Sequence, residues 1–280
     1  FEGLIDNKIK KAKHKDVAGI LHLGGTIIKT SRSKRFYEKE FRQKAFDNLK
    51  KYDITKLIVL GGNGSFNALK IFSQEFDISV IGIPATIDND IYESSYTLGV
   101  DTALNVIINA LDDIRNTSSS SKRAFVVETM GRDFGYLAAV SAITSGAEIC
   151  LIPEAKINYE SLEKKLKKEI KEGRDYILAI VSEGTKQTDK LVLWIQTNLK
   201  MQTRKIVLGH LQRGGNPSVF ERRMANEFVV YSIDKLRKEK MKSAIVYKNC
   251  KFKFIDLETI SNKKQVLNKK IIKQLEHMVK

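Results

Sequence analysis

Hydrophobic and polar positions follow two alternating periods along most of the chain. Short β-branched runs, typical of buried strands, are separated by longer segments in which apolar residues recur every three to four positions. The short runs predict strands at 56–60, 79–83, 124–128, 148–152, 176–181, 205–208 and 243–247. The longer segments predict helices near 66–74, 99–116, 134–145, 159–172, 190–199, 218–238 and 264–279, with a further helical period at 38–52.

Strands that alternate with helices are typical of βαβ units around a parallel sheet. The number of predicted strands in a chain of 280 residues favours two α/β lobes over a single sheet. No low-complexity linker divides the chain, and we place the boundary near Gly99.

Composition narrows the function classes. No apolar run approaches the roughly 18 residues that span a bilayer, so we expect no membrane contact. The first residues include neither a basic leader nor an initiator Met, and we interpret Phe1 as lying downstream of missing sequence. Cys150 and Cys250 have no metal-ligand spacing, so we expect two small, reduced core residues in a cytoplasmic protein.

The formal net charge of +16 raises the question of nucleic-acid binding. Much of the excess lies on lysine-rich helical segments such as 164–168 and 268–270. No basic stripe with interleaved aromatic residues is present, so we expect no nucleic-acid partner. A basic surface also attracts anionic phosphorylated metabolites.

A glycine-rich turn follows the first predicted strand. Gly61-Gly62-Asn63-Gly64-Ser65 lies between the strand at 56–60 and a helix start, with Ser65 as the expected N-cap. Glycines allow a ligand to approach the backbone, and a helix N-terminus offers unpaired N–H groups to an anion. The turn is neither a Walker loop nor a G-x-G-x-x-G fingerprint, and a tight turn without a ligand is the alternative.

Two aspartates follow the next predicted strand, in Pro84-Ala85-Thr86-Ile87-Asp88-Asn89-Asp90. In an extended segment Asp88 and Asp90 point to the same side, and the carboxyl ends of parallel strands are where α/β proteins bind ligands. One carboxylate could accept a proton from a hydroxyl while the other holds Mg²⁺. Solvation or turn formation is the alternative for such a pair.

Basic residues cluster twice more. Arg123 and Arg132 flank a predicted strand, and either could instead face solvent or form an ion pair. Arg204, His210 and Arg213 flank another strand and run into Gly214-Gly215. Arginine offers a fixed fork of donors for phosphate, and histidine can add one more.

Taken together, these segments resemble the 6-phosphofructokinase family from about Gly24 to Tyr247. The matching segments are Gly24-Gly25-Thr26 with Arg32, Gly61–Ser65, Pro84–Asp90, Thr117–Ser120, Met130-Gly131-Arg132, Ser182-Glu183 and Gly209–Gly215. The resemblance implies glycolytic phosphoryl transfer from ATP to the 1-hydroxyl of fructose 6-phosphate, with Mg²⁺ as cofactor.

The resemblance also assigns roles. It implies Asp88 as catalytic base, Asp90 with Asn63 at Mg²⁺, Thr86 beside the transferred group and Arg132 as its counter-charge. The nucleotide phosphates would bind Arg32, Gly62, Asn63, Gly64 and Ser65. The sugar phosphate would bind Thr86, Asp88, Met130, Gly131, Arg132, Glu183, His210 and Arg213, with Arg123 and Arg204 supplied by a neighbouring subunit of a homotetramer.

The resemblance further implies Rossmann-like three-layer lobes with mainly parallel sheets. The nucleotide lobe would comprise 1–99 and about 217–262, the sugar-phosphate lobe 100–216, and a C-terminal helix 263–280. Arg115 and Glu148 resemble effector-site positions. Gly64 resembles ATP-type members, because pyrophosphate-type members have Asp there. Ala85 is neither the Gly of ATP-type members nor the Lys of pyrophosphate-type members, but a methyl group is a smaller change than a cationic arm, so the resemblance implies ATP as donor.

Asn63 departs from the family's usual Asp, Ala85 departs from its usual Gly, and the family's N-terminal Gly-Gly-Asp turn does not appear in the sequence. A weakly active or inactive sugar-phosphate-binding subunit therefore stays open as an alternative, as does a pyrophosphate-dependent enzyme.

Overall fold

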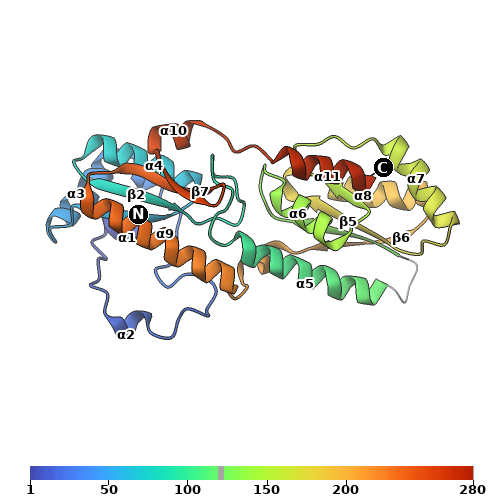
Figure 1. The fold of residues 1–280 in the computed structure, drawn as a ribbon, viewed down its shortest axis with the longest axis horizontal. Helices are drawn as coiled ribbons and strands as arrows, with labels where there is room; N and C mark the ends of the chain where they lie inside the picture. Colours follow the sequence, from blue (N-terminus) through green and yellow to red (C-terminus); the bar gives the residue numbers. More distant parts are fainter. Residues whose placement is uncertain (119–122, 280) are drawn as a thin grey trace. The chain divides into compact units, whose positions relative to one another are not determined.

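Two four-stranded sheets organise the chain, one in each of two units (Figure 1). The structure, a computed structural model, describes residues 1–118 and 123–279. The first unit contains Phe1–Thr86, Asp90–Gly99 and Asn216–Gln265. The second contains Ile87–Asn89, Val100–Gly215 and the C-terminal segment from Val266. The α/β fold predicted from the sequence pattern is confirmed, and each unit is described by itself below.

The first unit has the strand order β1-β2-β7-β8. Its strands are β1 (Lys56–Gly61), β2 (Ser79–Pro84), β7 (Lys242–Lys248) and β8 (Lys251–Asp256). Its helices are α1 (Glu2–Ile5), α2 (His14–Val17), η1 (Arg35–Tyr37), α3 (Lys39–Lys50), α4 (Asn63–Glu75), α9 (Val219–Lys238) and α10 (Leu257–Asn262). β1, β2 and β7 are parallel, and β8 runs antiparallel to β7.

The antiparallel strand β8 is absent from our sequence-based prediction. β7 and β8 are joined by Asn249 and Cys250, both with positive φ (52° and 59°), as a two-residue hairpin of the I′ type requires. Alternation of Phe252 and Phe254 with lysines was the available signal. Cys250 is exposed in this turn, so the expectation that it is a core residue was wrong, whereas Cys150 is partly buried.

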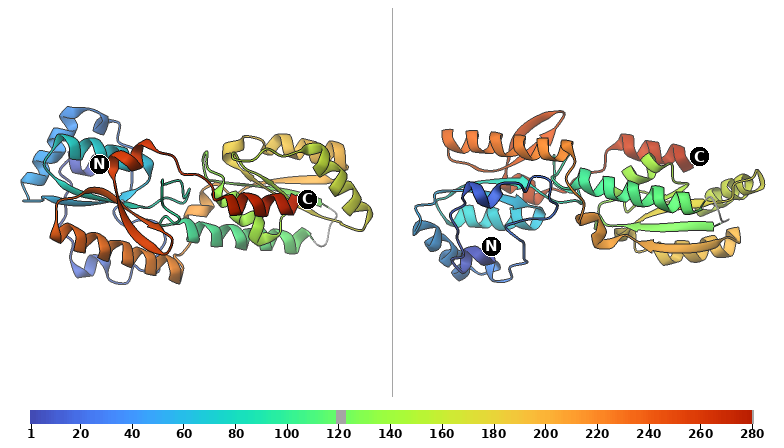
Figure 2. Two further views of the ribbon diagram at one scale, coloured as in Figure 1. Left: turned by 45° about the horizontal axis from the view of Figure 1, so that its top comes forward. Right: turned by 90° about the horizontal axis from the view of Figure 1, so that it is seen from below.

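The first unit's core lies between α4 and the sheet. All six residues of β2 are buried, which fits a strand paired on both sides. The apolar face of α4, with Phe66, Leu69 and Phe72, packs into one cluster with residues of the sheet. Figure 2 shows α9 on the opposite face of this sheet. This packing fixes the direction of the α4 N-terminus, where the glycine-rich turn lies.

The second unit has an all-parallel sheet with the strand order β4-β5-β3-β6. Its strands are β3 (Arg123–Thr129), β4 (Ile149–Leu151), β5 (Ile177–Ser182) and β6 (Gln202–Val207). Its helical segments are α5 (Val100–Ser118), α6 (Tyr136–Ser145), α7 (Tyr159–Lys171), η2 (Glu183–Thr185), α8 (Thr188–Trp194), the π-helical turn η3 (Ile195–Leu199), η4 (Gly209–Arg213) and α11 (Lys269–Val279).

Helices cover both faces of this second sheet. Leu162 and Leu166 of α7 and Leu191 of α8 join the apolar residues on one face of β3, β4 and β5 in a single cluster. Figure 2 shows α5 and α11 on the other face. With both faces covered, β5 is buried along its whole length. The loops that follow β3 and β5 therefore begin at the end of well-packed strands.

Helix boundaries differ from the sequence pattern at several ends. The segment expected to be one helix at 264–279 starts only at Lys269, and the short helix α10 precedes it. The pattern at 190–199 divides into α8 and the π-helical turn η3. Tertiary packing sets such ends, because a hydrophobic period does not specify where the last turn stops.

Candidate active site

The glycine-rich turn of the first unit connects β1 directly to α4. Gly62 is the N-cap and the helix begins at Asn63, so Ser65 lies in the first turn and the expectation that it is the N-cap was wrong. Gly61 has no room for a side chain, because an added Cβ would lie 2.3 Å from the Ser65 hydroxyl oxygen. The Ser65 side chain therefore lies close to the backbone of the turn. The first N–H groups of a 13-residue helix are thus presented at the end of β1, which suits an anion.

Asn63 is held against Asp90 in the first unit. The Asn63 side-chain amide donates to the Asp90 carboxylate (Nδ2 to Oδ2, 2.8 Å) and lies 3.4 Å from the Asp90 carbonyl oxygen. The contact brings together the two residues predicted at the metal. Within residues 1–118 and 123–279, no group of three or more His, Cys, Asp and Glu could hold a metal ion. A cation at Asp90 would therefore need further oxygens from a ligand or water.

Thr86 follows the end of β2 and is fixed by its backbone. Its carbonyl accepts a hydrogen bond from the buried Thr97 hydroxyl (2.6 Å), and Ala85 pairs with Leu98 in an isolated bridge. An added Cβ at Gly62 would lie 3.5 Å from the Thr86 Cβ. The glycine-rich turn and Thr86 are therefore neighbours, as expected for residues that follow adjacent parallel strands. Arg32, by contrast, lies exposed in the long segment before η1.

Asp88 belongs to the second unit and lies beside Arg132. Its carboxylate is almost fully buried, with 3% of the residue exposed, and its Oδ2 is 3.2 Å from Arg132 Nε. Asn89 has a positive φ of 54°, so the backbone turns between Asp88 and Asp90. The segment is therefore not extended, so the alternation on which the expected common direction of the two aspartates was based does not apply here. Asp88 contacts Arg132 of the second unit, whereas Asp90 contacts Asn63 of the first.

Arg132 lies in a tight turn after β3. Gly131 and Arg132 have φ values of 134° and 51°, and an added Cβ at Gly131 would lie 2.6 Å from the Phe134 carbonyl oxygen. The Arg132 backbone N–H donates to Glu183 Oε1 across 3.0 Å. A non-glycine residue in the left-handed region is uncommon and costs conformational energy. The hydrogen bond to Glu183 helps to hold this conformation and directs the guanidinium toward Asp88.

Gln212 connects two of the predicted motifs, and our sequence reasoning missed it. It is completely buried, accepts the Met130 backbone N–H at 3.2 Å and donates to the Gly209 carbonyl at 3.0 Å. It therefore joins the Met130–Arg132 turn to η4. Glutamine can both donate and accept, which suits a link between two backbone segments. Its only sequence signal was a polar side chain between His210 and Arg213, both of which are exposed.

The remaining arginines of the second unit lie away from Arg132. Arg123 is the first residue of β3, at the opposite end of the strand, and donates to Gln202 Oε1 at 2.8 Å. Arg204 is exposed on β6, opposite Phe125 in the β3–β6 register. The predicted segment Thr117–Ser120 ends in Ser119 and Ser120, which lie outside the described residues. The structure thus groups Asp88, Arg132 and Glu183 but not Arg123 with them.

Comparison with known proteins identifies the family. A family profile described as Phosphofructokinase matches residues 1–236, which is most of the chain. The chain belongs to the phosphofructokinase family. This phosphofructokinase is 51% identical over 276 residues to the ATP-dependent 6-phosphofructokinase of Sulfurimonas denitrificans, covering 98% of this chain and 86% of that protein. It is 50% identical over 273 residues to the enzyme of the same name from Sulfurovum sp. (strain NBC37-1), covering 97% of this chain and 84% of that protein.

Solved structures agree with this family assignment. The phosphofructokinase of Saccharomyces cerevisiae superimposes with a TM-score of 0.87 at 26% identity, covering 93% of this chain and 39% of that chain. A pyrophosphate-dependent phosphofructokinase from Marinobacter aquaeolei gives a TM-score of 0.78 at 18% identity, covering 95% of this chain and 77% of that one. At that identity the second match supports the fold alone. Over the described part of this phosphofructokinase, the helices lack the combination of length and apolar character needed to cross a membrane.

Proposed function

We propose that this phosphofructokinase transfers the terminal phosphoryl group of ATP to the 1-hydroxyl of fructose 6-phosphate, giving fructose 1,6-bisphosphate in glycolysis. The observation that carries the proposal is the buried Asp88 carboxylate 3.2 Å from Arg132, on turns that follow β2 and β3. A carboxylate can accept a proton from the attacking hydroxyl, and the guanidinium can offset charge on the transferred group. The relatives above, at about half identity, are named for this reaction with ATP.

The first unit supplies the donor contacts in this proposal. The N-terminal turn of α4, with Gly62, Asn63, Gly64 and Ser65, offers backbone N–H groups to the ATP phosphates. Arg32 adds a cationic donor. Thr86, next to Gly62, lies beside the transferred group. Phosphoryl transfer depends on positioning and charge neutralisation more than on covalent chemistry, and this set provides both.

The second unit supplies the acceptor contacts. Glu183 and the backbone from Met130 to Arg132 bind the sugar, while His210 and Arg213 donate to its phosphate. Gln212 holds the two turns together through its hydrogen bonds to Met130 and Gly209. The acceptor hydroxyl donates its proton to the Asp88 carboxylate, which lies beside Arg132.

Mg²⁺ fits the residues of the first unit as a weakly held cofactor. Magnesium in such sites usually keeps several waters and binds one or two carboxylates together with substrate phosphates. Asp90 provides one carboxylate, and Asn63 could add an amide oxygen, although its nitrogen faces Asp90. Bound magnesium would neutralise negative charge on the donor phosphates.

Arg123 and Arg204 contribute to the sugar-phosphate site of a neighbouring subunit in the proposed homotetramer. Arg123 is separated from Arg132 by the length of β3, a strand of seven residues, which supports this assignment. Arg204 lies on the neighbouring strand β6, opposite Phe125, near the same end of β3 as Arg123. The proposed setting is the cytoplasm, where ATP and phosphorylated sugars meet.

The proposal is tested by incubating the protein with fructose 6-phosphate and Mg²⁺ and either ATP or pyrophosphate, and measuring fructose 1,6-bisphosphate. We expect product with ATP, loss of at least roughly 10²-fold in kcat for Asp88→Ala, and no change for Asp112→Ala on the exposed surface of α5. Product formation with pyrophosphate but not with ATP would contradict the assignment of ATP as donor. Sugar-phosphate binding without turnover would favour the inactive-subunit alternative, for which Asn63 is the motivating residue.

A further inference from the structure

Residues 10–32 form a long, exposed segment that ends at Arg32. Nearly every residue in it is exposed, including Leu21 at 76% and Ile28 at 73%. The described hydrogen bonds of this segment all stay within it, for example from the Lys13 and Ala18 backbone. A segment of this kind has no core of its own to set its conformation. What fixes Arg32 must therefore come from the residues that flank the segment.

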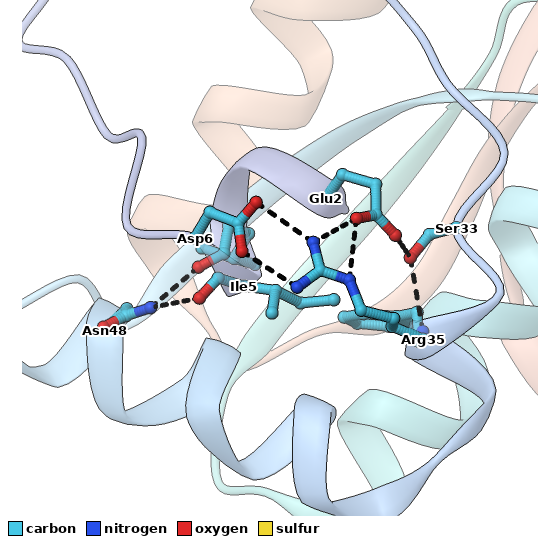
Figure 3. Close-up of polar contacts among 8 residues, drawn as sticks. Glu2, Ile5, Asp6, Ser33, Arg35 and Asn48 are labelled. Atoms are coloured by element: carbon cyan, nitrogen blue, oxygen red, sulfur yellow. Dashed lines mark hydrogen bonds and ion pairs between the residues drawn. The ribbon is translucent and has the colours of Figure 1, made fainter.

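The two flanks are joined by one arginine, as Figure 3 shows. Arg35, directly after the segment, donates from Nε to Glu2 at 2.9 Å, and from Nη1 and Nη2 to the two Asp6 oxygens at 2.9 and 3.0 Å. Its Nη2 also contacts Glu2. The guanidinium thus connects η1 to Glu2 of α1 and to Asp6, the C-cap residue of that helix.

Ser33 extends this connection to the neighbour of Arg32. The Ser33 hydroxyl donates to Glu2 and accepts the Phe36 backbone N–H at 3.2 Å. We name Glu2, Asp6, Ser33 and Arg35 the base clasp. Because Ser33 is adjacent to Arg32 in the chain, the clasp holds the backbone on the C-terminal side of Arg32.

The clasp itself is anchored on the first unit's core. Phe1 stacks on Phe36 with ring centroids 4.3 Å apart, and Ile5 is completely buried. Asn48 of α3 donates to the carbonyls of Leu4 and Ile5 at 2.9 and 3.0 Å. Figure 3 shows Asn48 directed toward Ile5. These contacts hold α1 and its C-cap residue Asp6 against the core, and Arg35 connects the C-terminal end of the exposed segment to their two carboxylates.

We propose that Arg35 is a positioning residue for the donor, acting through Arg32 by closing the base of the segment at 10–32. This inference rests on the proposed function of Arg32 as a phosphate-binding residue. Two carboxylates already engage the Arg35 guanidinium, so its charge is not offered to phosphate. Closing the base restricts the conformations of Arg32 before ATP binds. Arg32 therefore loses less conformational entropy on binding.

Charge supports the same role. Hydrogen bonds from Arg35 lower the pKa of both Glu2 and Asp6, so the clasp stays ionised through neutral and mildly acidic pH. All its members are partly exposed, so its worth for global stability is small. Loss of the base clasp should therefore weaken ATP binding more than it lowers the stability of the fold.

A double-mutant cycle in the full chain tests the proposal. We expect Arg35→Met to raise the KM for ATP roughly five- to tenfold, with the KM for fructose 6-phosphate and the melting temperature nearly unchanged. In the Arg32→Met background, Arg35→Met should have no further effect. Arg223→Met, which removes an exposed arginine paired with Glu227 on α9, is the matched control. An equal effect of Arg35→Met in both backgrounds, or none in either, would overturn the proposal.

A second measurement does not depend on turnover. Glu2→Gln weakens the clasp without changing any lysine or arginine, so limited trypsin digestion can be compared directly with the parent protein. Faster cleavage between Lys10 and Arg32 is expected, and Glu227→Gln should leave the cleavage rate unchanged. Unchanged cleavage in Glu2→Gln would mean that the clasp does not close the segment. If digestion changes but the parent protein forms no product, the proposed function fails rather than the clasp.

Discussion

The Asn63 amide nitrogen lies 2.8 Å from the Asp90 carboxylate oxygen, in the position where a second carboxylate would meet Asp90 directly. An amide can donate to a carboxylate, whereas two carboxylates at this separation repel unless a cation or proton lies between them. Asn63 therefore gives the Asp90 carboxylate a hydrogen-bond donor that a carboxylate at position 63 could not supply. The same bond competes with magnesium for Asp90.

Asn63→Asp should make the protein dependent on magnesium for stability. Without Mg²⁺ we expect a lower melting temperature, because like charges face each other, and addition of Mg²⁺ should restore it. Thermal unfolding with and without Mg²⁺, in the absence of nucleotide, measures this directly. Asn105→Asp is the matched control, because Asn105 also donates to an aspartate, Asp101, at 3.2 Å on the exposed surface of α5.

The same variant also tests whether the site is attenuated. A rise in kcat for Asn63→Asp at saturating Mg²⁺ would indicate that the amide limits the rate. An unchanged rate together with an unchanged melting temperature would contradict competition between Asn63 and magnesium.

Gly64→Asp should weaken the use of ATP without unfolding the protein. Nothing lies within 4 Å of a Cβ added at Gly64, so the fold can accept the side chain. Its carboxylate would stand at the first turn of α4 and repel donor phosphates, and we expect the KM for ATP to rise roughly tenfold, about 1.4 kcal/mol. Steady-state kinetics with ATP and with pyrophosphate measure the change. Asn67→Asp, exposed one turn further along α4, should have little effect.

Gln212→Leu should weaken binding of fructose 6-phosphate. Leucine leaves the buried Met130 N–H and Gly209 carbonyl without their partner, which costs about 1–3 kcal/mol per group. We expect a higher KM for fructose 6-phosphate, an unchanged KM for ATP and a lower melting temperature. Gln212→Glu keeps the acceptor for Met130 and should recover part of the loss. Equal losses for both substrates would contradict a role confined to the second unit.

The Arg42–Glu75 pair should govern acid stability of the first unit. Arg42 is buried, donates to both Glu75 oxygens at 2.6 and 2.7 Å, and also binds the carbonyls of Phe36 and Tyr37. Hydrogen bonding from Arg42 lowers the pKa of Glu75 below its ordinary value of 4.5. The unfolded carboxyl therefore binds protons first, so the stabilisation is present above pH 4.5 and is lost as pH falls through the lower folded pKa.

Arg42→Met should remove this acid dependence and cost roughly 3 kcal/mol of unfolding free energy at neutral pH, because Glu75 loses its partner. Denaturant unfolding between pH 3 and 7 measures both effects. Arg223→Met breaks an exposed pair with Glu227 and should cost less than about 1 kcal/mol. A similar loss of unfolding free energy in the two variants would show that the buried Arg42 pair stabilises the protein no more than an exposed pair does.

Local pattern was enough to predict much of the fold. β2 and β5 are short apolar runs with every residue buried, and helices such as α7 have a clear apolar period. β8 was missed because its residues alternate only over a short edge strand, and its turn contains Cys250 where glycine is usual. Gln212 was missed because burial and hydrogen bonding to two distant backbone segments leave no local signature.

The sequence alone determined the chemistry that is present: a glycine-rich turn after one strand, two aspartates after the next, and arginines near two others. Those features follow from residue type and spacing, which are local. Tertiary structure alone decided which groups meet, because partners come from segments far apart in the chain. Asp88 pairs with Arg132, Asp90 with Asn63, and Arg35 with Glu2 and Asp6. The left-handed Asn89 between the two aspartates ends the extended backbone that alternation assumes, since one backbone torsion redirects every atom after it.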